Sequence, residues 1–329
     1  MKDDNQTEPT DELDFFDEKK STDRFTETIR KAQRKTILRN ILISFSVSVV
    51  LFISLFLLWS FAMEYRKNQA IYDVRLYDSI SNPNVGTAGY QVITNGITNG
   101  ILEYGQYKII DGKPIDWGEK KLSYSIFGAL HRFAGDYSPI QIEKEQGGDG
   151  RKYHRETKQL LMEFYHPDVE YSTMINDFPR IANMTENLSA EMAVSFTERV
   201  SPEQVRDMIP EGVSLQWYWV ASHQDVEDDP HYDQSYSGDS LYGFDHREDL
   251  VDEEMFINNI KSGVSKEDGK YYENFNQLFN YVRGNNEEIS PNQVTVLGAV
   301  ITGTPENLLK MKEISIIRTG VLGATTINY

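Results

Sequence analysis

The apolar positions of this chain fall into one long run and several short alternating ones. Residues 41–63 carry no charged side chain and are mostly aliphatic or aromatic. At a helical rise of about 1.5 Å per residue they span roughly 35 Å, which exceeds a hydrocarbon core of about 30 Å. A buried core helix is the alternative, and a cleaved signal peptide is disfavoured because a long polar segment precedes the run. The run predicts an uncleaved signal anchor.

Strand, helix and strand patterns follow one another in the last third of the chain. Alternating apolar residues predict strands at 191–198 and 213–222. Between them, Ser201 followed by Pro202 and Gln204 predicts a helix at 201–209. One face of the second strand is expected to carry Val213, Leu215, Trp217 and Trp219.

The same order of elements then returns as a strand at 293–303, a helix at 304–313 and a strand at 314–323. Two βαβ units in tandem predict an α+β domain of the ferredoxin-like kind. The near-continuous apolar run at 294–301 suits a central strand covered on both faces. An insertion at 223–292 replaces what is usually a short hairpin, and helices are expected in it near 248–262 and 270–283.

The middle of the chain is organised by turns. Short apolar runs are broken by Asn-Gly pairs at 95–96 and 99–100. A polar, Gly-rich stretch at 143–156 predicts a domain boundary, and 157–167 reads as a short helix stopped by Pro167. The predicted segments are a tail at 1–22, a basic helix at 23–40, the anchor at 41–63, an N-terminal outer region at 64–150 and a C-terminal outer domain at 151–329.

Charged residues on either side of the anchor predict its orientation. Upstream lie Arg30, Lys31, Arg34, Lys35 and Arg39, and downstream lie Arg66 and Lys67. Five basic residues against two favour a cytoplasmic N-terminus. Trp59 and Tyr65 suit the aromatic belt of the opposite interface. The chain is therefore predicted to be a single-pass membrane protein with an extracytoplasmic α+β region.

Composition excludes some classes of binding partner and site. Acidic residues outnumber basic ones 51 to 33, for a net charge of −18. Such a surface repels nucleic acid, so no direct nucleic-acid binding is expected. The chain has no cysteine, which removes disulfides, thiol catalysis and cysteine-based metal sites. A disulfide-free outer domain favours a bacterium.

The predicted cytoplasmic tail is acidic and expected to be disordered. Within it, the stretch "DELDFFDE" carries Leu13, Phe15 and Phe16. These residues are either a chance cluster or a short linear motif, in which the aromatics anchor in a groove and the carboxylates steer towards a basic partner.

The basic helix at 23–40 has Phe25 and Ile29 on one narrow face. It is either a charge collar beside the membrane or part of a binding segment. It is far too short for an enzyme domain, so the inner part is expected to act by binding.

The insertion carries the best candidates for a metal site, namely His223, Asp225, His231, Asp233 and His246. Carboxylates and imidazoles can bind a divalent cation, but their spacing matches neither an EF-hand loop nor H-E-x-x-H. A dense acidic loop is more often solvated, so no metal or other cofactor is predicted. No nucleophile elbow, P-loop or dinucleotide fingerprint occurs, and no catalytic residue is predicted.

Three stretches carry a resemblance to a known family. They are "IYDVRLYDSISNPN" (71–84), "AEMAVSFTERVSPEQVRDMIPEGVSLQWYWVAS" (190–222) and "VLGAVITGTPENLLKMKEISIIRTGVLGATT" (296–326). Together with the basic helix and anchor, they resemble the sigma factor regulator family of Gram-positive bacteria. Its members are single-pass anti-sigma factors, including those that restrain extracytoplasmic-function sigma factors in bacilli.

The resemblance implies that the inner segment sequesters an extracytoplasmic-function sigma factor and that the outer domain senses envelope stress or binds a second membrane or envelope protein. It implies no catalytic residues. Two alternatives stay open: an anchored extracytoplasmic enzyme or metal-dependent binding domain centred on 223–246, and an envelope structural protein with an inert tail.

Overall fold

The computed structural model of the chain describes residues 12–132, 138–142, 150–222, 235–238, 241–246 and 252–327. The chain divides into two compact units, Met1–Ala62 and Met63–Tyr329. The boundary expected near 150 falls inside the second unit.

Helix α1 (Glu12–Asp78) contains both the predicted basic helix and the predicted anchor. It begins within the segment expected to be a disordered tail, and it continues 15 residues past the expected end of the anchor. No Pro or Gly interrupts the chain between Pro9 and Pro83, so nothing breaks the helix. In the second unit, α1 buries one face through Met63, Ala70 and Val74.

A four-stranded antiparallel sheet follows α1. Its described strands lie in chain order as β1 (Gly86–Asn95), β2 (Asn99–Ile110), β3 (Lys113–Ser125) and β4 (Leu130–Arg132). The first Asn-Gly pair ends β1 and the second begins β2, as expected of turn residues. Asp111 and Gly112 form the two-residue turn between β2 and β3, and both have positive φ, as a type I′ turn requires.

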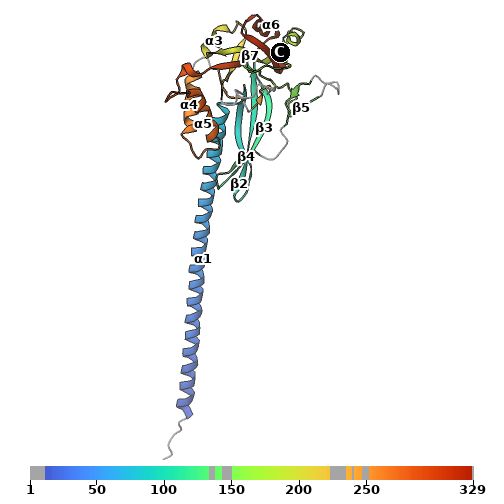
Figure 1. Cartoon of the computed structure of the whole chain (residues 1–329). Helices are drawn as coiled ribbons and strands as arrows, with labels where there is room; N and C mark the ends of the chain where they lie inside the picture. Colours follow the sequence, from blue (N-terminus) through green and yellow to red (C-terminus); the bar gives the residue numbers. More distant parts are fainter. Residues whose placement is uncertain are drawn as a thin grey trace, which may run out of the picture. The chain divides into compact units, whose positions relative to one another are not determined.

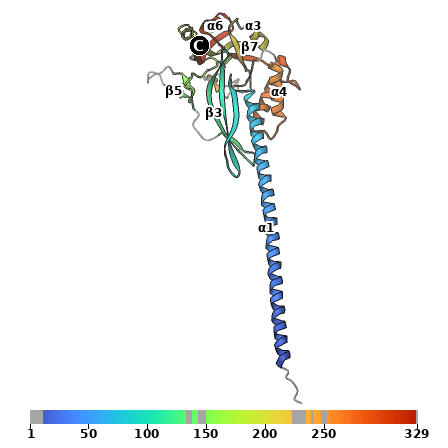
Figure 2. The ribbon, with the colours of Figure 1, turned by 180° about the vertical axis from the view of Figure 1, so that it is seen from behind.

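A small sheet lies beside it, formed by β5 (Ile140–Gln141) and β6 (Lys152–Tyr153). Figures 1 and 2 show β5 and helix α4 (Asp252–Val264) on opposite sides of β3.

The second sheet is built from the C-terminal strands. These are β7 (Leu188–Val200), β8 (Ser214–Val220), β9 (Gly243–Asp245), β10 (Val296–Gly303) and β11 (Ile317–Ile327). Their order is β11-β7-β10-β8-β9, and every neighbouring pair is antiparallel. Every residue of β10 is buried, as expected of a central strand.

Helix α3 (Pro202–Met208) links β7 to β8, and α6 (Pro305–Leu309) links β10 to β11. Helix α3 therefore joins the parallel strands β7 and β8, between which β10 lies. Helix α6 joins the parallel strands β10 and β11, between which β7 lies. The two strand–helix–strand segments, which follow one another in the chain, interleave in one sheet.

The predicted helix starts are confirmed. The Ser201 side chain accepts a hydrogen bond from the Gln204 N–H, and the Gln204 side chain accepts one from the Ser201 N–H. Thr304 caps α6 in the same way, by accepting from the Asn307 N–H. The remaining helical elements are α2 (Phe178–Ile181), α5 (Tyr272–Arg283), η3 (Pro291–Gln293) and η4 (Lys310–Glu313). Helices α4 and α5 are the pair expected in the insertion.

Both faces of the five-stranded sheet are buried. One face packs against helices through residues such as Val205 of α3, Phe256 of α4 and Leu278 of α5. The other face carries Trp217 and Trp219 and is covered by non-helical segments. The core therefore has two layers, one on each side of β10.

The expected face of β8 is wrong in one respect. Leu215 packs with the helix-covered side, whereas Trp217 and Trp219 lie on the opposite side. The pairing with β10 shifts here, because Val300 is opposite Trp217 and Ile301 is opposite Leu215. The extra residue, Gln216, is a β-bulge, and a bulge reverses the alternation of side chains. A prediction that assumes strict alternation of side chains along a strand could not reveal this bulge.

The helix expected at 157–167 is also wrong. This segment is extended and makes isolated bridges, Leu160 with Tyr153 and Phe164 with Tyr236. Leu160 is buried, and so is every residue from Met162 to His166, so burial here does not follow one face of a helix. Phe164 packs on Trp217 and Trp219, so tertiary contacts outweigh the local helix preference.

His166, near the end of this segment, predicts a pH dependence of stability. Its side chain is 1% exposed, and burial lowers its pKa to about 4, with Arg199 and Arg318 acting in the same direction and Asp168 opposing them. The unfolded chain, with a histidine pKa near 6.5, binds more protons than the folded chain below that pH. Stability should therefore fall as pH is lowered from about 6.5 towards 4. Urea unfolding at several pH values between 7 and 5 measures this slope.

The matched control is His166→Asn, which can still accept the hydrogen bond that the Asp168 N–H donates to Nδ1. The variant should lose a clear part of the slope between pH 7 and 5. An unchanged slope would show that other groups carry the pH dependence.

Candidate functional site

The predicted partner-binding residues lie on the first part of α1. Phe25 is 69% exposed and Ile29 is 42% exposed, one helical turn apart on the same face. Leu13, Phe15 and Phe16 fall within the bounds of α1, but their side chains lie outside the part of the chain that the structure describes. The helix thus presents an apolar pair in an otherwise polar stretch.

The side chains of residues 41–58 of the predicted anchor are exposed, whereas Met63 at its end is buried. Among the described residues, α1 is the one helix long and apolar enough to cross a membrane, and its most apolar stretch has no buried residue. An exposed apolar surface of this extent is unfavourable in water, and α1 is compatible with a single-pass membrane protein.

The predicted flanks of the anchor differ in their contacts. Arg34, Lys35 and Arg39 are exposed. Trp59 is partly buried and packs against Phe56, with ring centroids 5.6 Å apart. The downstream flank belongs to the second unit. There Tyr65 is exposed, Lys67 pairs with Glu64, and Arg66 donates to the Ile126 carbonyl at 3.1 Å.

Of the metal candidates, only His246 is a described residue, and His223, Asp225, His231 and Asp233 lie outside the described ranges. His246 Nδ1 lies 2.7 Å from Asp252 Oδ2 and 3.1 Å from the Tyr218 hydroxyl. Within the described ranges, no group of three His, Asp or Glu side chains is placed to hold a metal ion. His246 contributes to the junction of β8, β9 and α4.

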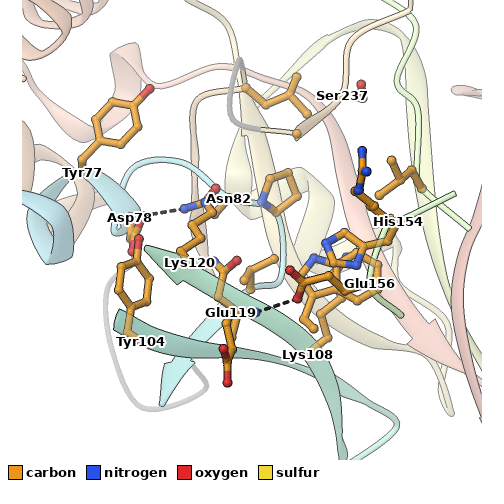
Figure 3. Close-up of a pocket in the computed structure, with 18 of the residues that line it drawn as sticks. Tyr77, Asp78, Asn82, Tyr104, Lys108, Glu119, Lys120, His154, Glu156 and Ser237 are labelled. Atoms are coloured by element: carbon orange, nitrogen blue, oxygen red, sulfur yellow. Dashed lines mark hydrogen bonds between the residues drawn. The ribbon is translucent and has the colours of Figure 1, made fainter. Parts of the chain in front are cut away.

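A pocket of about 710 Å³ lies in the second unit, between the four-stranded sheet and the segments that cover it. Figure 3 shows Tyr77, Asp78, Asn82 and Tyr104 along one side and Lys108, His154 and Glu156 along the other. The apolar part of the lining comes from residues such as Trp117, Leu122, Leu161, Met162 and Phe164.

Lys108 lies at the floor of this pocket. Its ammonium group is 4.2 Å from the centre of the Trp117 ring and forms an ion pair with Glu191 of β7 at 2.8 Å. Both side chains are almost fully buried, and burial lowers the pKa of Lys108 while Glu191 opposes that shift. The pair joins the four-stranded sheet to the five-stranded sheet.

The adjoining wall is formed by His154 and Glu156. The His154 ring stacks on Trp117 at 4.6 Å, and burial lowers the pKa of His154, so the ring is neutral at pH 7. Glu156 accepts a hydrogen bond from the Glu119 N–H at 2.9 Å. Gly118, with φ +84°, allows this approach, because a Cβ there would lie 2.1 Å from the Glu156 carboxylate.

Gly118→Ala is expected to destabilise the second unit. The substitution adds left-handed strain of about 1–2 kcal/mol and displaces Glu156 from the Glu119 N–H. Gly112→Ala is the matched control, because Gly112 also has positive φ but a Cβ there meets no atom within 4 Å. Urea unfolding should show a larger loss for Gly118→Ala. Equal losses would mean that the Glu156 contact is not stabilising.

The charges around the pocket differ from those of the whole chain. Its lining contains Lys108, Lys120, Lys121, Arg155 and Lys270 against Asp78, Glu119 and Glu156. Lys108 and Lys121 are paired with Glu191 and Glu103, so the lining is close to neutral over an aromatic floor, in a chain of net charge −18. Such a site can hold a ligand with an apolar body and an anionic group.

Sequence reasoning did not find this pocket. One signal was present, because Tyr104, Gln106 and Lys108 alternate along β2 and all three line it. His131 and His154 also line the pocket.

Comparison with known proteins gives two matches. The model of the sigma factor regulator N-terminal family matches residues 26–115, and that of the sigma factor regulator C-terminal family matches residues 181–324. No curated protein and no solved structure matches the chain. The family is regulatory rather than catalytic, and membership implies an anti-sigma role with a sigma factor as partner. The two matches together cover more than half of the chain, in the order N-terminal then C-terminal, so the chain belongs to the sigma factor regulator family.

Proposed function

We propose that this protein is a membrane-bound anti-sigma factor that sequesters an extracytoplasmic-function sigma factor through the part of α1 that precedes the anchor. The observation that carries the proposal is the exposed pair Phe25 and Ile29. Phe25 lies just before the N-terminal family match and Ile29 lies within it, and both precede an exposed apolar run. Exposed aromatic and aliphatic anchors on a helix are typical of binding in a groove.

The proposed orientation places the N-terminus in the cytoplasm and the second unit outside. Its support is the excess of basic residues before the anchor, five against two. A cytoplasmic segment of about 40 residues is long enough to form one binding helix with an acidic extension. Leu13, Phe15 and Phe16 would add a second group of anchors to Phe25 and Ile29.

We assign regulation to the second unit. The pocket lined by lysines and aromatic rings around Lys108 and Trp117 is the proposed site for an outer signal that combines an apolar body with an anionic group. A second membrane or envelope protein could present such a group. We also assign the five-stranded sheet to the ferredoxin-like class, because the order β11-β7-β10-β8 with helices after β7 and β10 is that of a split βαβ pair.

Co-purification tests the sigma factor proposal. The full chain in detergent should retain at least one extracytoplasmic-function sigma factor when co-expressed with candidates. A chain lacking residues 1–40 but keeping the anchor should retain none. Absence of any complex with the full chain would reject the proposal.

Cysteine labelling tests the orientation. The chain has no cysteine, so single substitutions give unambiguous sites. In intact cells a membrane-impermeant maleimide should label Asn68→Cys and leave Thr28→Cys unlabelled. The reverse pattern would overturn the proposed orientation without affecting sigma factor binding by the purified protein.

A further inference from the structure

Two turns at one end of the four-stranded sheet present exposed apolar side chains. Ile97 lies in the turn between β1 and β2, and Phe127 lies in the turn between β3 and β4; each side chain is 81% exposed. The two turns are adjacent, because the Ile126 N–H donates to the Thr98 carbonyl at 2.8 Å. Figure 1 shows β4 next to the corresponding end of β2. We call the pair Ile97 and Phe127 the turn surface.

The sequence around both turns lacks charge, and the charged residues near Phe127 come from other segments, since Arg66, Asp73, Lys266 and Asp268 line a small pocket with it. No Asp, Glu, Lys or Arg occurs at 79–102 or 122–131, although such residues make up 26% of the sequence. Exposed apolar groups of this size, grouped and without charged neighbours in the sequence, indicate a contact with an apolar phase.

The turn surface lies close, along α1, to the end of the predicted anchor. The Arg66 side chain donates to the Ile126 carbonyl at 3.1 Å and lies beside Gly128 of the same turn. Arg66 is three residues beyond Met63, a helical rise of about 5 Å. That distance is within the polar interface of a bilayer, which is roughly 5–7 Å thick on each side.

We propose that Ile97 and Phe127 insert into the interface of the membrane that α1 crosses and hold the second unit against the lipid. The proposal rests on the proposed function only through the anchor at 41–63, and it does not depend on the orientation or on the sigma factor. An aromatic and an aliphatic tip at the level of Arg66 match the composition of a membrane interface, where aromatic rings and basic side chains gather. The lipid surface is therefore a binding partner of the second unit as well as of the anchor.

Single cysteines test the proposal in the full chain reconstituted in lipid vesicles without other proteins. Ile97→Cys and Phe127→Cys are labelled with an environment-sensitive fluorophore, and Pro114→Cys is the matched control. Pro114 is exposed near the start of β3, the strand that leads into the turn containing Phe127. At the rise of an extended strand, Pro114 and Phe127 are roughly 40 Å apart. Lipids with a quencher just below the headgroups should quench the labels at 97 and 127 several times more strongly than the label at 114. Iodide, a quencher dissolved in the water, should quench the label at 114 more strongly than the labels at 97 and 127.

A fourth label separates this proposal from the proposed function. Phe52→Cys lies within the predicted anchor and should be quenched only by quenchers deep in the lipid. If the label at 52 is quenched while those at 97 and 127 behave like the label at 114, the turn surface does not touch lipid and the anchor stands. If the label at 52 is reached by iodide, the anchor and the turn-surface proposal are both wrong.

Discussion

Glu191→Ala is expected to lower the free energy of unfolding of the second unit by about 3–5 kcal/mol, because it leaves the buried ammonium of Lys108 without its counter-charge. Glu191 accepts from Lys108 through both carboxylate oxygens, at 2.9 and 2.8 Å, and from Asn84 at 2.7 Å. The Ala324 N–H makes a fourth, longer contact at 3.4 Å. All four contacts are lost together.

The size of this effect comes from desolvation rather than from the attraction itself. Neither charged group can reach water in the folded chain, since their side chains are 4% and 0% exposed. A domain of this size has a total stability of about 5–15 kcal/mol, so the variant should be close to unfolding at 37 °C. Urea unfolding of the full chain in detergent, followed by tryptophan fluorescence, measures the loss.

The control removes both charges. Lys108→Met with Glu191→Leu keeps the volume of the pair and leaves no buried charge, so it should be markedly more stable than Glu191→Ala. If the double variant is as unstable as the single one, the pair contributes by packing and not by charge. A single variant within about 1 kcal/mol of the native chain would show that Lys108 finds another partner.

Phe25→Ala combined with Ile29→Ala should weaken sigma factor capture by about 100-fold or more. Two buried anchors that each contribute about 1.5–2 kcal/mol account for a change of that size. Both side chains are exposed on α1 without the partner, so their removal should leave the fold intact. Equilibrium binding of the detergent-solubilised full chain to the purified sigma factor measures the change.

Thr26→Ala combined with Thr28→Ala is the matched control in the same segment. Their hydroxyls bond to the carbonyls of Thr22 and Arg24 within the helix, so the control removes no apolar anchor. It should bind like the native chain. We predict a similar loss for Phe15→Ala combined with Phe16→Ala. If both aromatic pairs leave binding unchanged, the anchors lie elsewhere in the segment.

The elements that could be predicted are those whose causes are local. The strands around Met192 and Val300 and the helix start at Ser201 each follow from a few adjacent residues, and the structure has them where they were expected. Helix α1 contains the expected basic helix and the expected anchor in one continuous element, and its continuation to Asp78 follows from the absence of Pro and Gly.

The candidate site was less predictable because its residues meet only in the folded chain. Lys108 and Glu191 are 83 residues apart, and no local pattern relates a lysine in one strand to a glutamate in another. The segment at 157–167 became extended because Phe164 packs on two tryptophans that lie more than 50 residues further along the chain. One extra residue at Gln216 moved Leu215 to the opposite side from Trp217.

The sequence by itself determined that this protein has one long apolar helix, two capped helices between strands and no cysteine chemistry. These features depend on composition and on neighbours along the chain, where backbone geometry and hydrophobic periodicity act directly. Only the tertiary structure decided the interleaved strand order, the buried Lys108–Glu191 pair with the pocket above it, and the turn surface of Ile97 and Phe127. Those features arise when segments distant in sequence exclude water from between them, and the free energy of that burial depends on partners that no local pattern specifies.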